Sequence, residues 1–305
     1  MLKKILMVIL LVASTICLAA CAGKEKSSAN GDKTDGQGYT VSGDVIANED
    51  YFKWSPTDDT QIVGYTEEGM KQIELVIPKK CTSVQGLEKN TTVKYIKFEN
   101  DDTVILSTTF SGCTALEKIE LPANLPEIDN DVFNGCTSLK EVTIPSGVTK
   151  IGSNSFADCT ALGKVELSES LKVVGRKAFN DCTSLKLIKF YDAVTDIEKS
   201  AFENCSALKE INFGKGLKNI GESAFQKCTA LTTVKLPQGV LMLGADAFAN
   251  CDTLESIYLP ASVEKADVSS IVQTHEIKVY VVEGSYMDGR VSELMGTKFY
   301  DKQYQ

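Results

Sequence analysis

The sequence predicts a repeat solenoid, mainly β with short helical turns, whose coils are each 23 residues long. Three observations support this fold class. Phenylalanine, cysteine and leucine recur at intervals of 23 residues, each repeat contains a strand-like alternation, and turn-forming residues stand at fixed offsets. Two of the recurring sets are Phe110, Phe133, Phe156, Phe179, Phe202, Phe225 and Phe248, and Cys113, Cys136, Cys159, Cys182, Cys205, Cys228 and Cys251. Because the interval never varies, each repeat is expected to form one coil that contacts only its neighbours.

Residues 1–20 are predicted to be a lipoprotein signal peptide. Lys3 and Lys4 precede an apolar run, residues 5–16, that is too short to span a bilayer comfortably. The sequence LAAC, which ends at Cys21, resembles the signal of bacterial lipoproteins. The resemblance implies cleavage before Cys21 and attachment of acyl chains, such as palmitate, to this residue. Two acyl chains would anchor the protein stably on the outer face of a bacterial membrane, at the cell surface.

Residues 21–38 are predicted to be the lipidated cysteine and a flexible tether. The segment from Ala22 to Gly38 has no aromatic or branched apolar side chain and cannot build a core of its own. Removal of residues 1–20 would leave 30 Lys and Arg against 41 Asp and Glu, a formal charge of −11. This acidic balance argues against a nucleic-acid partner and against membrane contact other than through the anchor.

Residues 39–109 are predicted to be an N-terminal cap with degenerate repeats, since the open end of a solenoid core must be covered. The segments 62–66 and 73–78 have the composition of an entry coil, and 93–98 that of an imperfect strand. Trp54 and the surrounding residues 39–59 carry no readable pattern.

Residues 110–260 form seven regular repeats, and one coil can be read in order. Ile119 and Leu121 alternate as in a strand, and Pro122 ends it because proline has no N–H to donate. A second short extended piece reaches Ile128, and a few helix-forming residues lead to the next phenylalanine. Six of the seven residues before the ladder cysteines are Gly, Asn or Asp, with Lys227 the exception, which predicts a left-handed backbone at this position.

Residues 261–305 are predicted to be a C-terminal cap. They contain a strand at 277–282, a short helix at 286–295 and a last strand at 298–300.

The repeat pattern LxxIxLPxxLxxIxxxAFxxCxx resembles the BspA-type, or Treponema-type, leucine-rich repeat of bacterial surface proteins. The resemblance implies a leucine-rich-repeat horseshoe and a role in adhesion or recognition of a protein or glycan at the cell surface. The chain departs from the pattern at Ser168, Tyr191 and Gly214, where the proline is missing, so the turn geometry there is open.

The ladder cysteines are expected to be buried core residues. Zinc sites use closely spaced pairs, whereas these cysteines are 23 residues apart. Equivalent residues of stacked coils lie roughly 5 Å apart, while a disulfide needs about 3.8 Å between Cβ atoms. A small buried hydrophobe fits the pattern best, while a disulfide role and a redox role remain open as alternatives.

No enzyme motif is present. The chain has one histidine, His275, and no recognisable triad, phosphate loop or metal-binding motif, so catalysis, cofactors and metals are not expected. His275 is expected to be an exposed residue of the cap.

Outward-pointing strand residues of the solenoid are expected to line its concave face. In the first repeats these residues alternate in charge, which predicts ion pairs between strands, as from Lys118 to Glu141. In the later repeats they mix exposed apolar, aromatic, basic and amide groups, as a protein contact surface does. The candidate partner-binding residues are Leu187, Lys189, Tyr191, Asn212, Lys235 and Tyr258.

The sequence therefore favours a cell-surface lipoprotein that binds a protein or glycan partner. A structural envelope scaffold or assembly factor with a bacterial partner is the main alternative. A transporter-associated substrate-binding lipoprotein is less favoured, because it requires two α/β lobes around a closing cleft. The oligomeric state is not predicted.

Overall fold

The structure is a computed structural model that describes residues 45–271, 273, 275–294 and 300–304. The predicted signal peptide, Cys21 and the tether lie outside these residues. The described residues belong to one compact unit. Within the described part of the chain, no helix has the length and apolar character needed to cross a membrane.

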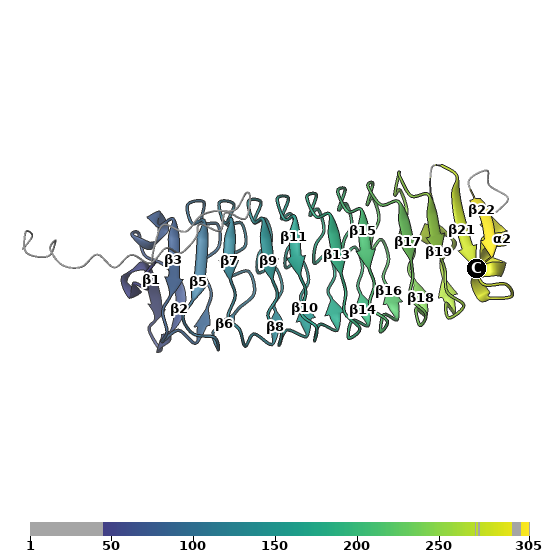
Figure 1. Ribbon diagram of the computed structural model, residues 1–305. Helices are drawn as coiled ribbons and strands as arrows, with labels where there is room; N and C mark the ends of the chain where they lie inside the picture. The colour runs from purple at the N-terminus through teal and green to yellow at the C-terminus, as the bar shows by residue number, and fades with distance from the viewer. Residues whose placement is uncertain (1–44, 272, 274, 295–299, 305) are drawn as a thin grey trace, which may run out of the picture. The chain divides into compact units, whose positions relative to one another are not determined.

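The compact unit is a stack of β coils, and each regular coil contributes one longer and one shorter strand (Figure 1). The longer strands are β3 (Glu74–Ile77), β5 (Tyr95–Phe98), β7 (Lys118–Glu120), β9 (Glu141–Thr143), β11 (Lys164–Glu166), β13 (Leu187–Lys189), β15 (Glu210–Asn212), β17 (Thr233–Lys235) and β19 (Ser256–Tyr258). The shorter ones are β4 (Ser83–Val84), β6 (Val104–Ile105), β8 (Glu127–Ile128), β10 (Lys150–Ile151), β12 (Val173–Val174), β14 (Asp196–Ile197), β16 (Asn219–Ile220), β18 (Met242–Leu243) and β20 (Lys265–Ala266). The repeat solenoid predicted from the 23-residue interval is confirmed.

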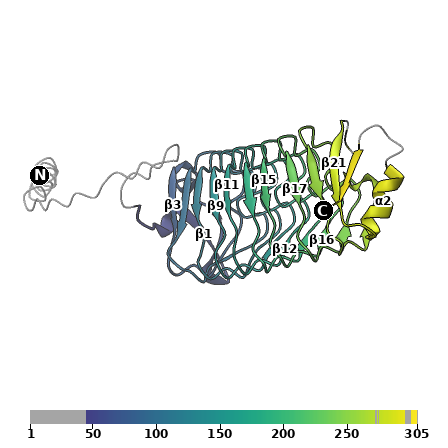
Figure 2. The same ribbon diagram turned by 45° about the vertical axis from the view of Figure 1, so that its right-hand side comes forward.

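The two sets of strands lie on different sides of the coils (Figures 1 and 2). The shorter strands from β8 to β20 form one continuous parallel sheet of seven strands. The longer strands instead form separate parallel groups: β3-β5-β7, β9-β11, β13-β15, and β17-β19 continued by β21 and β22. Between regular coils the register is one repeat, so Leu187 faces Glu210 and Lys189 faces Asn212. Strands β3 and β5 are instead offset by 21 residues, and β19 and β21 by 22. We call the side that carries the longer strands the long-strand face.

The core is a column of phenylalanine rings along the solenoid axis. From Phe110 to Phe248, successive ladder rings stack with centroids 5.1 to 5.6 Å apart. All seven rings are fully buried. Each coil therefore lacks a closed core of its own and completes it with the neighbouring coils.

The segments that lead to each ladder cysteine, predicted as short helical turns, form single tight turns. The residue before each cysteine has positive φ in all seven repeats, including Lys227 at 60°. A second left-handed position lies four residues earlier, as at Asp131 with φ 57° before Gly135. Because two left-handed residues bracket the segment, only single turns form, such as the one closed by the Cys136 N–H on the Phe133 carbonyl at 3.0 Å.

The two proline-free turns at 168 and 214 have different physical explanations. The Ser168 hydroxyl donates to the Ser146 carbonyl at 2.8 Å and accepts the Ser170 N–H at 3.0 Å, which fixes the turn by hydrogen bonds. At Gly214 the backbone comes very close to the preceding coil, and an added Cβ would lie 2.1 Å from the Tyr191 carbonyl oxygen. Only glycine fits there.

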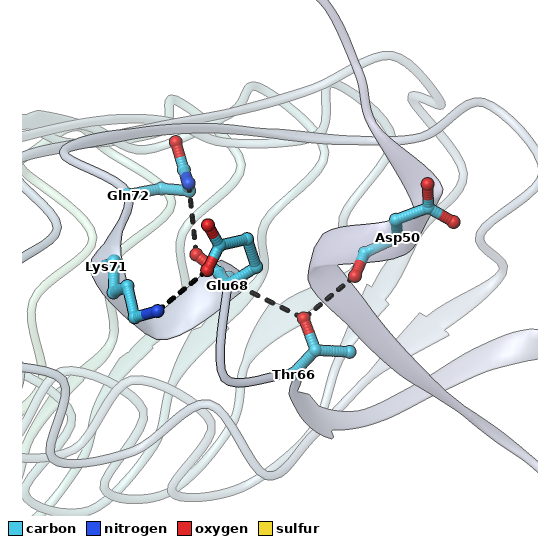
Figure 3. A network of polar contacts seen from close by, with 6 residues as sticks. Asp50, Thr66, Glu68, Lys71 and Gln72 are labelled. Atoms are coloured by element: carbon cyan, nitrogen blue, oxygen red, sulfur yellow. Dashed lines mark hydrogen bonds and ion pairs between the residues drawn. The ribbon is translucent and has the colours of Figure 1, made fainter. Parts of the chain in front are cut away.

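The N-terminal cap begins with an antiparallel hairpin that the sequence did not reveal. The 3-10 helix η1 (Glu49–Tyr51) leads into β1 (Phe52–Ser55), which pairs with β2 (Asp58–Tyr65). The Thr66 hydroxyl, just beyond β2, links two 3-10 helices in the network in Figure 3: it donates to the Asp50 carbonyl of η1 at 2.8 Å and accepts the Gly69 N–H of η2 (Gly69–Lys71) at 3.1 Å. In the same network the Lys71 ammonium pairs with the Glu68 carboxylate at 2.8 Å.

The C-terminal cap contains η3 (Val268–Ile271), β21 (Ile277–Val281), α2 (Tyr286–Leu294) and β22 (Tyr300–Tyr304). The predicted strand and helix of the cap are confirmed. The last strand was predicted at 298–300, but it begins at Tyr300 and extends the long-strand sheet by pairing with β21. Residues 298 and 299 lie outside the described residues.

Candidate functional site

The long-strand face changes in character along the stack, and its first half is neutralised by ion pairs. Glu117 accepts Lys140 at 2.6 Å and Lys94 at 3.2 Å from the two flanking coils. Lys118 pairs with Glu120 at 4.0 Å within one strand. The predicted ion pair between strands, from Lys118 to Glu141, is therefore replaced by a pair within one strand. Side chains two residues apart on a strand point to the same face, so Lys118 reaches Glu120 of its own strand.

Lys164 pairs in the same way with Glu166 of its own strand at 2.8 Å. Three carboxylates of the first half, those of Glu117, Glu120 and Glu166, are thus paired with lysines of the same or a flanking coil, whereas Glu141 forms no ion pair among the described residues. Such exposed pairs each contribute about 0–1 kcal/mol to stability, but together they leave little net charge on this part of the face.

The second half of the face carries lysines that have no acidic partner. Lys186, Lys189, Lys209 and Lys235 are exposed and form no ion pair among the described residues. Glu210 is the only carboxylate in segments 186–189, 209–213 and 232–235, and one of its oxygens accepts the Asn212 amide at 3.0 Å. This half of the face is locally basic on an acidic protein.

The candidate residues lie in two neighbouring rows on this basic half. One row contains Leu187, which is 44% exposed, beside Glu210. The other contains Lys189, Asn212 and Lys235, and β17-β19-β21 continue it to Tyr258 and Tyr280. Tyr191 lies outside both rows, two residues beyond the end of β13 at Lys189.

The two predicted aromatic contacts are less exposed than the sequence suggested. Tyr191 and Tyr258 are half-buried, and a lysine ammonium lies over each ring. Lys189 Nζ is 4.8 Å from the Tyr191 centroid, and Lys235 Nζ is 5.1 Å from that of Tyr258. The Tyr258 and Tyr280 rings stack 4.2 Å apart. This surface therefore exposes its lysines, the Asn212 amide and the Leu187 side chain, while its tyrosine rings are partly covered.

A slot opens in the long-strand face where β15 and β17 separate. No backbone hydrogen bond joins these strands in the described structure. In contrast, the neighbouring pair β13-β15 is closed by bonds such as the Phe190 N–H to the Asn212 carbonyl at 2.8 Å. An open depression with a volume of about 550 Å³ lies between the two strands. Its lining is Lys209, Glu210, Ile211, Asn212, Phe213, Thr232, Thr233 and Lys235.

The floor of this slot is apolar. Ile211 and Phe213 are only partly buried, whereas the residues equivalent to Ile211 in the other regular coils, such as Ile188 and Val234, are buried. The sheet is also interrupted between β7 and β9 and between β11 and β13, but the inward strand-centre residues there remain buried. The β15–β17 slot therefore differs from the other two interruptions by exposing part of a strand-centre residue, Ile211, although Leu121 after β7 is also only partly buried.

The ladder cysteines are free, fully buried thiols that bond between coils. The Cys182 Sγ donates to the Phe156 carbonyl at 3.2 Å, and the same contact recurs from Cys136 to Cys251 at 3.2 to 3.4 Å. Burial raises the pKa of Cys113 and Cys251 to about 12 each. The thiols serve as core residues with an added hydrogen bond, and little of the reactive thiolate forms.

His275 is a packing residue rather than an exposed one. It is half-buried, and its Nε2 lies 2.6 Å from the Leu254 carbonyl oxygen. In the described part of the chain, no three His, Cys, Asp or Glu side chains gather closely enough to hold a metal ion.

Sequence reasoning missed Lys209, Thr233, Tyr280 and the apolar floor of the slot. Tyr280 could have been found by aligning the cap strand with the repeat, since Val279 takes the register of Ile257. The separation of β15 from β17 has no comparable signal, because both strands keep the ordinary alternation of the repeat.

Stacked 23-residue coils around a phenylalanine column, each with a leucine-led strand, define a leucine-rich-repeat β-solenoid. The profile of the BspA type leucine rich repeat region matches residues 85–179 and 151–278, with six copies of the repeat. The chain belongs to this family, since the matched ranges cover more than half of its length.

The chain is similar to several solved structures, one of which, with a TM-score above 0.5, shows the same fold. The chain is 24% identical to a leucine-rich repeat protein from Bacteroides ovatus, with a TM-score of 0.57, covering 78% of this chain and 71% of that one. A leucine-rich repeat protein of T. pallidum is 22% identical over 84% of this chain and 97% of its own, with a TM-score of 0.43. A leucine-rich cell surface protein from Faecalibacterium prausnitzii is 20% identical over 80% and 96%, with a TM-score of 0.33. A comparison with curated proteins gives no significant match.

Proposed function

We propose that the protein is a lipid-anchored cell-surface protein that binds a protein or glycan partner through the second half of its long-strand face. One observation carries the proposal: four exposed lysines in this region form no ion pair among the described residues, whereas Lys94, Lys118, Lys140 and Lys164 of the first half are paired. Unneutralised charge beside exposed Leu187 and an open slot is typical of a surface that gains from a partner.

The anchor part of the proposal rests on the LAAC sequence ending at Cys21. Acylation of Cys21 would hold the solenoid at the membrane, and the segment up to residue 38 would space it from the lipid surface. Metabolic labelling with a palmitate analogue, compared between the parent and Cys21→Ser, tests this part. Label retained by Cys21→Ser would contradict it.

The binding part is tested by a pull-down with the mature chain carrying Cys21→Ser. The immobilised protein would be exposed to host extracellular-matrix and epithelial extracts and, separately, to the envelope fraction of the producing organism. The binding-face variant combines Leu187→Ser, Lys189→Glu and Lys235→Glu. The matched control, Lys118→Glu with Lys164→Glu, reverses two lysines on the first half of the same face.

A host protein or glycan retained by the parent and the control, but lost from the binding-face variant, would support surface recognition. Retention of envelope proteins alone with the same pattern would favour the scaffold alternative. Equal retention by the parent and both variants would show that the second half of the long-strand face does not bind the partner. Circular dichroism and thermal unfolding establish that the variants keep the fold.

A further inference from the structure

The slot between β15 and β17 combines an apolar floor with a basic rim. Ile211 and Phe213 form the floor, and Lys209 and Lys235 stand on the two strands that border it. Its volume of about 550 Å³ falls within the range of roughly 300–1,000 Å³ that ligand sites occupy. The slot can therefore receive a bulky group rather than a single ion.

The facing strand edges add backbone groups to this rim. If β15 and β17 were paired like the neighbouring coils, the Phe213 N–H would bond to the Lys235 carbonyl, as Phe190 does with Asn212. The described structure has no such bond. Backbone donors and acceptors at the slot are thus available to the backbone of an incoming extended chain.

The charge around the slot selects an anionic partner. Within the described part of the chain, Lys186, Lys189, Lys209 and Lys235 form no ion pair, while Glu210 is engaged by the Asn212 amide at 3.0 Å. A partner that brought carboxylates to this rim would gain charge-assisted contacts without displacing an existing pair.

The apolar floor favours a peptide over a polysaccharide. Sugar rings usually require an open aromatic face, but the Tyr191 and Tyr258 rings each have a lysine ammonium within about 5 Å of the centroid, and Tyr258 also stacks on Tyr280. An anionic polysaccharide would use the lysines and leave Ile211 and Phe213 uncovered. A peptide side chain can cover both.

We propose that the β15–β17 slot is an anchor site for an extended acidic segment of a partner protein, in which one aromatic or large aliphatic side chain enters the slot between flanking carboxylates. This inference rests on the proposed function and narrows its partner to a protein with this chemistry. The apolar side chain packs on Ile211 and Phe213, and the carboxylates reach Lys209 and Lys235.

Fluorescence anisotropy with three labelled probe peptides tests the proposal on the mature chain carrying Cys21→Ser. The first peptide has a phenylalanine flanked by two aspartates on each side. The second replaces the phenylalanine with serine, and the third replaces the aspartates with lysines. We expect the first peptide to bind at least about tenfold more tightly than either of the others. Only this peptide has both an apolar side chain for the floor of the slot and carboxylates for the lysines of its rim.

Two variants separate the floor from the rim. Thr233→Phe would fill the slot without changing charge, and we expect it to abolish the advantage of the phenylalanine peptide over the serine peptide. Lys209→Glu with Lys235→Glu should weaken the phenylalanine peptide at least about tenfold, whereas the control Lys118→Glu with Lys164→Glu should leave it within about twofold. Chemical-shift changes at the Phe213 and Lys235 amides of the unaltered chain locate the peptide independently of any variant's stability.

Equal binding of the phenylalanine and serine peptides, or shift changes away from β15 and β17, would overturn the proposal. If the phenylalanine contributes nothing to peptide binding and heparin displaces the peptide, the lysines bind anionic polysaccharide instead, and the proposal is wrong. If the probes fail to bind while the pull-down still depends on Leu187, Lys189 and Lys235, the slot inference fails and the proposed function stands. If the probes bind as expected but the pull-down is insensitive to these residues, the proposed function fails.

Discussion

The thiol of Cys182 donates a hydrogen bond to the carbonyl oxygen of Phe156 in the preceding coil, with 3.2 Å between sulfur and oxygen. The two residues belong to the two most regular ladders of the sequence. The contact shows why cysteine suits this position: it is small enough for the turn beside the phenylalanine column and can still donate to a buried carbonyl.

We expect none of the eight cysteines of the mature Cys21→Ser chain to react with a thiol-specific reagent at pH 8 while the protein is folded. All eight are buried, and burial raises their pKa values, for example that of Cys81 to about 11, so the reactive thiolate is scarce. All eight should react after addition of denaturant. Rapid labelling of even one thiol in the native protein would contradict the buried ladder.

Phe179→Ala should lower the free energy of unfolding by about 3–5 kcal/mol, the cost of truncating a fully buried aromatic residue. The Phe179 ring stacks between Phe156 at 5.2 Å and Phe202 at 5.1 Å, so its loss leaves a cavity in the middle of the column. Chemical denaturation measures the change. The exposed residue on the next strand supplies the control, Leu187→Ala, with an expected effect within about 0.5 kcal/mol. A loss below about 1 kcal/mol for Phe179→Ala would mean that the column is not the core.

Asp158→Asn should raise the stability at neutral pH. Asp158 is an exposed residue, but the surrounding chain partly desolvates its carboxyl and so raises its pKa, and the nearby Asp181 carboxylate raises the pKa further. The charged form therefore destabilises the folded state, by an amount that solvent screening keeps small. This penalty is complete above the raised pKa and is lost as the pH falls through the ordinary aspartate range, below about 3.9. Thermal unfolding from pH 7 to pH 3 should show the variant's advantage shrinking with falling pH.

The backbone at this position favours the same substitution. Asp158 has φ 60°, and the equivalent residues Asn204 and Asn250 have φ 62° and 58°. Asparagine therefore enters without a conformational penalty. An advantage of Asp158→Asn that grew toward acid pH would contradict the charge explanation.

Gly214→Ala should destabilise the protein, because the new Cβ would lie 2.1 Å from the Tyr191 carbonyl oxygen and the two coils would have to separate. We expect a loss of about 1–3 kcal/mol, typical of overpacking. Gly289→Ala, in the exposed part of α2 with no atom within 4 Å of the added Cβ, is the matched control and should be neutral or stabilising. Equal melting temperatures for Gly214→Ala and the parent would show that the close approach is absent.

The sequence was sufficient to predict those features that repeat with the 23-residue interval. The coil, the phenylalanine column and the left-handed residue before each cysteine follow from single residues that occupy the same position in every repeat. The β1–β2 hairpin could not be predicted, because it occurs once and its pairing joins residues such as Phe52 and Tyr65 without a periodic pattern.

The candidate site was predicted in part for the same reason. Leu187, Lys189, Asn212 and Lys235 were found because the repeat fixes which strand residues point outward. The half-burial of Tyr191 and Tyr258 depends on where lysine side chains settle, and the slot depends on a separation between strands of ordinary sequence. The burial of the two tyrosines and the position of the slot both depend on contacts between coils, so the sequence of a single repeat does not predict them.

The central claim is that the second half of the long-strand face contacts a partner at the cell surface. Site-specific photocross-linking on intact cells tests it most directly, with the full chain carrying p-benzoylphenylalanine in place of Leu187, Lys118 or Lys150. Lys118 lies on the first half of the same face, and Lys150 lies on β10 in the opposite sheet. The account predicts one discrete cross-linked species from position 187 and none from positions 118 and 150. Cross-linking of the same species from position 150, with none from position 187, would contradict it.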